Sequence, residues 1–330
     1  MKTKHANISI FVPHIGCPHK CSFCNQNTIT GQSFIPHASD VIASCEKAIS
    51  CGVDPLNTEI AFFGGSFTAI PKNYMLELLG TAYEYVKNGF KGIRVSTRPD
   101  AINTEILEIL KEYGVTAIEL GAQSMDDEVL LMNERGHTAS DVVEASNLIK
   151  EYGFSLGLQM MVGLYGSSVE KDIMTARKIA NLNPSEVRIY PTVILENTKL
   201  GDLFKNGVYK TYDLETAIDL CSELLDIFEN KGIKVIKLGL HSSQEVEENM
   251  LGGVYHPAFR ELCESRRFRN EMERLINDVK VNSFTVKPCD ISKAIGQQKC
   301  NLEYFKQKGI TVKIIPDEEQ TQMITPVLGE

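Results

Sequence analysis

The chain has 330 residues, of which 43% are hydrophobic and 23% are charged, and its formal net charge is −9. This composition is typical of a globular protein with a sizeable core, and no apolar run of about 18 residues could cross a bilayer. Because no export signal is recognisable at the amino terminus, we expect reduced cysteines and a cytoplasmic location.

Short apolar runs rich in β-branched residues alternate with amphipathic segments through the first two thirds of the chain. The amphipathic segments, such as NYMLELLGTAYEYVK, have the period of a helix. Strands this apolar, each followed by a helix, are typical of a parallel sheet that helices cover. The predicted strands are, in chain order, ISIFVPHI, TEIAFFGG, GIRVSTRP, AIELGAQS, SLGLQMMVG and EVRIYPT. We therefore predict an α/β fold, a partial (β/α)6 TIM-like barrel, with its site in the loops at the carboxyl ends of the strands.

The pattern changes near residue 200, which predicts a barrel over residues 1–200 and a small α+β carboxyl-terminal extension over residues 201–330. The second part has a helical pattern, ETAIDLCSELLDIFENKG, a short strand, KVIKLGL, and a long basic helix at 258–280. Residues 257–315 contain twelve Lys and Arg against seven Asp and Glu. Such a charge is typical either of a polyanion-binding surface or of a solvated helix rich in lysine.

Three cysteines near the amino terminus, Cys17, Cys21 and Cys24, have the spacing Cys-x3-Cys-x2-Cys. Three thiolates this close can hold three irons of a four-iron cluster and leave the fourth iron open to a small molecule, for which S-adenosylmethionine (SAM) is the expected ligand. Zinc is the alternative, with His14 and His19 as candidates for the fourth ligand. The glycine and proline beside the first cysteine, and the aromatic ring before the third, favour the cluster. The other six cysteines do not repeat this spacing.

Further motifs follow the cysteine loop CPHKCSFC, namely GGSFT, STRPD, ELGAQS, RGHT and IYPT. On these motifs the chain is identified as a member of the radical SAM superfamily. It is most similar to the radical domain of the Elongator catalytic subunit and to bacterial relatives that share its carboxyl-terminal extension. The resemblance covers about residues 8–240. The acetyltransferase domain of the Elongator subunit has no counterpart in the remaining residues.

The resemblance implies that the three cysteines hold a [4Fe-4S] cluster with SAM beside it. The glycine pair after the second strand would bind the amino group of SAM, because only glycine leaves room for that approach. Gln123 and Arg135 resemble a pair that holds the ribose and the carboxylate, and the fork of an arginine suits a carboxylate. Phe23 would lie against the adenine, and Gln159 would face the adenosyl group. The implied cofactor-binding residues are Phe23, Gly64, Gly65, Ser66, Ser96, Arg98, Gln123, Arg135 and Gln159.

The implied activity is that of a radical SAM enzyme, which cleaves SAM reductively to a 5′-deoxyadenosyl radical that abstracts hydrogen from a substrate. Such a site must be dry, so we expect an apolar barrel interior. A reductant such as flavodoxin or ferredoxin is an expected partner. The alternative function is an iron–sulfur and SAM-binding carrier or regulator without radical turnover. Candidates to contact substrate or to relay a proton are Tyr190, Glu119, His14 and Arg188.

Residues 281–316 give one indication of the substrate. Their predicted order of strand, helix, loop, helix and strand, with Ile-Gly-x-x in the helical region, resembles the KH fold, whose Gly-x-x-Gly loop binds nucleic-acid backbone. Lys299 replaces the second glycine and would face a phosphate. RNA, namely tRNA, and a small metabolite are therefore the candidate substrates, and a lid over the barrel is the alternative role for the extension. The lysines predicted to hold RNA are Lys293, Lys299, Lys306 and Lys308.

Overall fold

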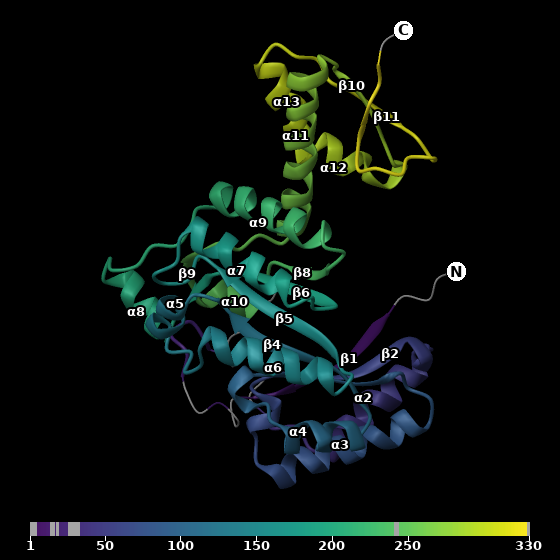
Figure 1. Cartoon of the computed structure of the whole chain (residues 1–330), viewed down its shortest axis with the longest axis vertical. Helices are drawn as coiled ribbons and strands as arrows, with labels where there is room; N and C mark the ends of the chain where they lie inside the picture. Colours follow the sequence, from purple (N-terminus) through teal and green to yellow (C-terminus); the bar gives the residue numbers. More distant parts are fainter. Residues whose placement is uncertain (1–4, 14–16, 18–19, 26–33, 241–243, 329–330) are drawn as a thin grey trace. The chain divides into compact units, whose positions relative to one another are not determined.

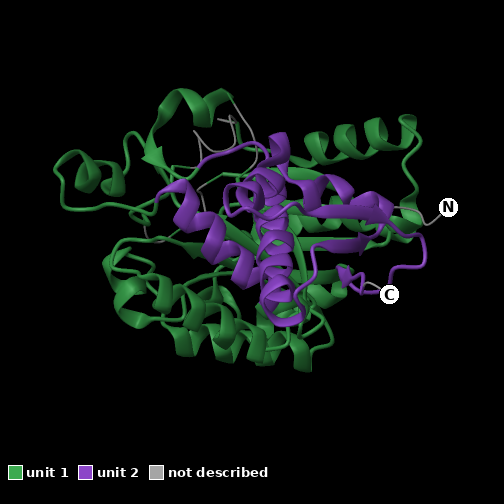
Figure 2. Cartoon of the chain, turned by 90° about the horizontal axis from the view of Figure 1, so that it is seen from above, with its two compact units in different colours: residues 1–212, 227–254 green, residues 213–226, 255–330 purple. Residues whose placement is uncertain are grey.

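The computed structural model describes residues 5–13, 17, 20–25, 34–240 and 244–328. The chain divides into two compact units (Figure 2). Unit 1 comprises residues 1–212 and 227–254, and unit 2 comprises residues 213–226 and 255–330. The domain boundary near residue 200 stays a prediction.

Unit 1 is built on one curled sheet of seven parallel strands, in the order β1-β2-β3-β4-β5-β6-β8 (Figure 1). The strands are β1 (Ala6–Val12), β2 (Thr58–Gly64), β3 (Gly92–Thr97), β4 (Val115–Gln123), β5 (Ser155–Val162), β6 (Glu186–Pro191) and β8 (Lys234–Leu238). The predicted partial barrel is confirmed. The sheet also includes β8, a seventh parallel strand beyond the six predicted βα units.

The helices of unit 1 pack along the strands, and Figure 1 shows α6 and α7 beside β4 and β5. Right-handed crossovers place such helices on one face of a parallel sheet. The core lies on this face, where Ile60 and Phe62 of β2 and Leu78 of α3 are fully buried. The helices are α2 (Ala38–Ser50), α3 (Lys72–Lys87), α4 (Thr104–Glu112), α5 (Asp127–Met132), α6 (Ala139–Glu151), α7 (Val169–Asn181), α8 (Lys199–Lys205) and α10 (Gln244–Asn249).

Polar caps set where several of these helices begin. Asn103 accepts a hydrogen bond from Ile106 N–H at the start of α4, and Thr138 and Asp141 form a reciprocal capping box at the start of α6. A short antiparallel ribbon joins β7 (Val193–Leu195) and β9 (Met250–Gly253). Within the described residues, we find no helix whose length and hydropathy would suit a membrane span.

Unit 2 packs helices on a three-stranded sheet of order β11-β10-β12. Strand β10 is parallel to β11 and antiparallel to β12. The core of unit 2 includes Phe284 of β10, Met272 of α11 and Phe305 of α13. The main elements are α9 (Leu214–Glu229), α11 (Phe259–Val279), β10 (Ser283–Val286), α12 (Ile291–Ile295), α13 (Cys300–Gln307), β11 (Lys313–Pro316) and β12 (Thr325–Pro326). The expected order of strand, two helices and strand is present, and the likeness to the KH fold stays a prediction.

Candidate functional site

The motifs predicted for the site lie at the carboxyl ends of neighbouring strands. The cysteine loop follows β1, Gly64 ends β2, Thr97 ends β3, Gln123 ends β4 and Gly163 follows β5. Because these strands are parallel neighbours, the motifs share one edge of the sheet. His14 and His19 lie outside the described residues.

The cysteine loop is anchored through Ser22, which is fully buried. Its N–H donates to the backbone oxygen of Asn133 at 3.1 Å, and its hydroxyl donates to Asn133 Oδ1 at 2.9 Å. The Ser22 carbonyl accepts from Leu200 N–H at 2.8 Å. Asn133 Nδ2 also donates to the carbonyl oxygens of Tyr165 and Val129, both at 2.8 Å. Asn133 therefore fixes the cysteine loop to the loops after β4 and β5, a role that the sequence motifs did not indicate.

The cysteine thiols lie in a protected environment, with Cys21 buried and Cys17 and Cys24 half-buried. Desolvation, with the nearby Cys21 and Cys17, raises the pKa of Cys24 to about 12, and desolvation also raises the pKa of Cys17. In the described part of the chain, no three His, Cys, Asp or Glu side chains are arranged to hold one metal ion. A four-iron cluster does not require such convergence, because each thiolate binds a different iron. Cluster binding would release protons from these thiols.

Arg135 reaches the cysteine loop from the segment after β4. Its Nη1 donates to Cys21 Sγ at 3.1 Å, and its Nη2 donates to the Gly121 carbonyl at 2.6 Å. The guanidinium carbon lies 5.9 Å from the centre of the Phe23 ring. Arg98 Nη2 donates to the backbone oxygen of Arg135. Four sequence-predicted residues are thus brought together, with Cys21 and Phe23 at the guanidinium of Arg135 and Arg98 at its backbone oxygen.

Beside Cys21, Phe23 and Arg135, three buried polar atoms have no hydrogen-bond partner among the described residues. Arg98 Nη1, Gln123 Oε1 and Arg135 Nε are buried and accept or donate no hydrogen bond within the described structure. Buried polar atoms nearly always have partners, so these atoms indicate a site for a polar ligand. Two guanidinium donors and one amide acceptor fit a molecule with a carboxylate and a hydroxyl or ammonium group, as SAM has.

His137 was not among the predicted site residues, although it lies in the RGHT motif. Its Nε2 lies 3.2 Å from the Ala122 carbonyl, and its Nδ1 is buried without a partner. Desolvation, together with the positive charge of Arg135, lowers the pKa of His137 to about 4. The imidazole is therefore neutral at neutral pH and adds no charge beside Arg135.

The glycine pair at the end of β2 lies against the end of β1. A Cβ on Gly64, whose φ is +110°, would lie 2.6 Å from the Val12 carbonyl oxygen, and a Cβ on Gly65 would lie 3.0 Å from that of Pro13. Close backbone packing therefore requires glycine here independently of any cofactor. Next to the pair, the Ser66 hydroxyl shares a hydrogen bond of 2.8 Å with Thr97 Oγ1.

Replacing Gly64 with alanine is expected to lower the free energy of unfolding by about 2–4 kcal/mol, because the new methyl group combines backbone strain with a clash against β1. Urea denaturation measures this loss. Gly52→Ala is the matched control, since Gly52 also has a positive φ (+76°) but its Cβ would meet no atom within 4 Å. If both variants lose the same free energy of unfolding, the close approach of the Val12 carbonyl does not explain why residue 64 is glycine.

The barrel interior, or lumen, contains a buried lattice of charged side chains, so the expected apolar interior is wrong. Arg94 donates to Glu59 at 2.9 Å, to Glu119 at 3.0 Å and to Glu186. Arg188 donates twice to Glu119, at 2.7 and 2.9 Å. Glu59, Arg94 and Glu119 are each at most 5% exposed. The apolar residues that dominate the strand sequences face the helices, and the lattice occupies alternate positions on the other face.

Glu119 is saturated with donors, because Gln159 Nε2 also donates to it at 2.9 Å. A proton relay through Glu119 would have to break one of these bonds. The same bond directs the Gln159 amide oxygen away from Glu119. Tyr190 follows Arg188 on the same side of β6 and hydrogen-bonds with it, and desolvation raises the pKa of Tyr190. Tyr190 is therefore a neutral phenol at neutral pH, able to donate a hydrogen bond.

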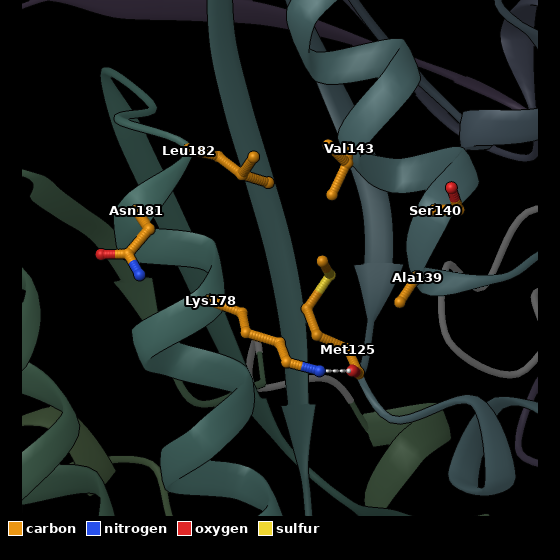
Figure 3. A pocket seen from close by; sticks show the side chains of 7 residues that line it. All are labelled: Met125, Ala139, Ser140, Val143, Lys178, Asn181 and Leu182. Carbon is orange, nitrogen blue, oxygen red and sulfur yellow. Dashed lines mark hydrogen bonds between the residues drawn. The ribbon is translucent and has the colours of Figure 1, made fainter.

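A separate pocket lies between α6 and α7 (Figure 3). Met125, Val143 and Leu182 give it apolar walls, and Lys178 Nζ donates to the Met125 carbonyl at 2.9 Å. The lining contains none of the residues predicted for the site. The pocket is thus distinct from the site at the strand ends.

Comparison with known families and proteins gives a consistent result. A family model described as the Radical SAM superfamily matches residues 11–179, just over half of the chain, and one described as the Radical_SAM C-terminal domain matches residues 184–269. The tRNA uridine(34) acetyltransferase of Dehalococcoides mccartyi is 29% identical over 252 residues, which cover 66% of this chain and 55% of that protein. Elongator complex protein 3 of Homo sapiens is 31% identical over 200 residues, which cover 54% of this chain and 36% of that protein. The chain spans about half the length of the first of these curated relatives, and less of the second.

Solved structures share the fold. The archaeal Elp3 of Methanocaldococcus infernus, with an N-terminal deletion, matches with a TM-score of 0.62 and 21% identity over 82% of this chain and 64% of that chain. Streptococcus suis SuiB matches with a TM-score of 0.53 and 15% identity over 74% of this chain and 51% of that chain. Both likenesses support the partial barrel described above.

Proposed function

Because the chain belongs to the radical SAM superfamily of enzymes, we propose that it cleaves SAM reductively at a [4Fe-4S] cluster held by Cys17, Cys21 and Cys24. The observation that carries this proposal is the set of partnerless buried atoms of Arg98, Gln123 and Arg135 beside the cysteine loop. When bound, the cluster and SAM together supply one electron and a carbon radical that abstracts hydrogen from the substrate. The protein binds, orients and shields these groups.

We assign the cofactor contacts by chemistry. The Nε–H of Arg135 and the free Nη1 of Arg98 would bind the carboxylate of SAM, and the Oε1 of Gln123 would accept from a hydroxyl or ammonium group. Phe23 offers a flat apolar surface for the adenine, and the amide oxygen of Gln159 would accept from the ribose. Gly64, Gly65, Ser66 and Ser96 line the same strand ends in this proposal.

On the substrate side, we propose that Tyr190 donates a hydrogen bond to the substrate and that Arg188 lies beside it. Both side chains are half-buried, and both lie on the lumen side of β6. The guanidinium of Arg188 donates two hydrogen bonds to Glu119, which fix its orientation. His14 stays a candidate for proton transfer.

The reaction is tested by reconstituting the protein without oxygen, reducing it with dithionite and measuring 5′-deoxyadenosine after addition of SAM. The proposal predicts 5′-deoxyadenosine and methionine in equal amounts. Binding of SAM without formation of 5′-deoxyadenosine would instead identify a carrier or regulator. In the cell, flavodoxin or ferredoxin is the proposed reductant, and the cytoplasm is the proposed location.

We propose tRNA as the substrate. Relatives are named tRNA uridine(34) acetyltransferases, and residues 296–299 of unit 2 stand where the sequence predicts a loop that contacts nucleic-acid backbone. This loop, Gly296–Lys299, joins α12 to α13, with Gly296 buried and the other three residues exposed, and Gly296, Gln298 and Lys299 all have positive φ. Lys299 thus adopts the backbone conformation that glycine favours. A small metabolite is the alternative substrate.

The structure changes which lysine should be tested for RNA binding. Lys293 binds Glu264 and Asp290, at 2.7 and 2.9 Å, and Lys308 binds Glu273. Lys306 lies 3.8 Å from Glu303. Lys299 is exposed and has no such acidic partner within the described part of unit 2. Lys299 is therefore the lysine best placed to meet a phosphate.

Lys299→Gln is expected to weaken tRNA binding severalfold and to reduce the slope of log affinity against log salt by about one. Filter binding at several salt concentrations measures both quantities. Lys72→Gln, which removes an exposed lysine from unit 1, is the control and should leave both unchanged. A wild-type slope for Lys299→Gln would exclude this loop from the RNA contact.

A further inference from the structure

One cysteine of the proposed cluster already has a charged hydrogen-bond donor. Arg135 Nη1 lies 3.1 Å from Cys21 Sγ, and Arg135 and Cys21 are only 6% and 8% exposed. Water therefore does little to screen this contact, and a charge-assisted bond in such a place is stronger than one at the surface.

Arg135 is held firmly in this position. Its Nη2 donates to the Gly121 carbonyl at 2.6 Å, and its own N–H donates to the Leu130 carbonyl at 3.0 Å. A Cβ on Gly121 would lie 3.3 Å from Nη2, so a glycine on β4 makes room for the guanidinium. Arg98 holds the Arg135 backbone oxygen from the other side. The contact with Cys21 is thus built into the fold.

The charge of Arg135 has no carboxylate partner within the described residues. The neighbouring Arg98 is different, because Asp100 accepts two hydrogen bonds from it, both at 2.9 Å. His137 is neutral at neutral pH, since its pKa is lowered to about 4. A buried charge without a carboxylate partner is costly, and the sulfur of Cys21 is the side-chain atom that the guanidinium meets, at 3.1 Å.

We propose that Arg135 raises the reduction potential of the cluster through its charged hydrogen bond to Cys21 Sγ. Reduction adds one negative charge to a centre that the three thiolates already make anionic, and hydrogen bonds to the sulfurs favour the reduced form. Arg135 therefore sets how readily an external one-electron donor reduces the centre. This inference rests on the proposed function and adds a role for Arg135 that is separate from binding SAM.

The test is a redox titration of the reconstituted protein, followed by electron paramagnetic resonance in the absence of SAM. Omitting SAM removes any effect of Arg135 on cofactor binding. Arg135→Met, which lacks both charge and donor, should shift the midpoint potential to a more negative value. Arg135→Lys, which keeps the charge, should shift it less. Arg177→Met removes an exposed arginine on α7 and should leave the midpoint unchanged.

The outcomes separate this inference from the proposed function. If wild-type protein takes up no iron, the proposed function fails. If the wild-type cluster forms and Arg135→Met titrates at the wild-type midpoint, the role of Arg135 is overturned and the proposed function stands. If Arg135→Met does not assemble a cluster, Arg135→Gln, which removes the charge but keeps a polar side chain, decides the question. A wild-type midpoint in Arg135→Gln with wild-type iron content would then reject the inference, because the lost charge would have had no effect.

Discussion

A Cys21→Ser protein is expected to bind almost no iron and to form no 5′-deoxyadenosine. Serine has no thiolate, and a four-iron cluster with only two cysteine ligands left would be labile. The substitution also removes the sulfur that accepts the hydrogen bond from Arg135 Nη1. Iron and sulfide analysis after anaerobic reconstitution measures the loss, and wild-type protein should contain about four irons per chain.

Cys51→Ser is the control for this experiment. Cys51 is an exposed free thiol directly after α2, and its replacement should leave the iron content and the brown colour unchanged. Full iron content in Cys21→Ser would place the metal elsewhere and remove the basis of the proposed function. Loss of iron in both variants would instead show that reconstitution depends on cysteines in general.

Glu119→Ala is expected to lower the free energy of unfolding by roughly 3–5 kcal/mol, the loss typical of breaking a buried ion pair. Glu119 is 1% exposed, and both Arg94 and Arg188 donate to it. Its removal would leave Arg188 without its carboxylate partner in the lumen and Arg94 with one fewer. Urea denaturation of the cluster-free protein measures the change as a lower transition midpoint.

A surface ion pair provides the comparison. Glu105 binds Lys72 at 2.6 Å with both side chains largely exposed, so Glu105→Ala should leave the midpoint nearly unchanged. The transition midpoint of Glu119→Gln should lie between those of Glu119→Ala and Glu105→Ala, because the amide keeps one acceptor oxygen but has no charge. A Glu119→Ala midpoint equal to that of Glu105→Ala would show that the lattice gives no net stability.

The parallel sheet was predictable because its strands combine apolar runs with intervening helical periods. Strand β8 was not counted with the barrel strands, since KVIKLGL stands apart from the regular alternation and only strand pairing shows that it extends the sheet. The cysteine loop was predictable from spacing, which is local in the sequence. Its anchor, Asn133, was not, because the bond to Ser22 joins residues that are 111 positions apart.

The lattice in the lumen also depends on contacts between residues that are far apart in the sequence. Glu59, Arg94 and Glu119 are each the single charged residue of a strand, and Arg188 shares β6 only with Glu186, so each looks like a local charge in an apolar run. Their meeting depends on register, such as the pairing of Ser96 with Glu119 and of Gln159 with Arg188. Side chains two residues apart share a face, so the register decides which of them meet across strands.

The sheet of unit 1 does not close on itself. Strands β1 and β8 are its two edges and do not pair with each other in the described residues, whereas a complete barrel has no edge. Each edge strand therefore has a strand neighbour on one side only. The backbone groups on its outer side depend on side chains, loops or water for their hydrogen bonds, where a closed ring would supply them from a neighbouring strand.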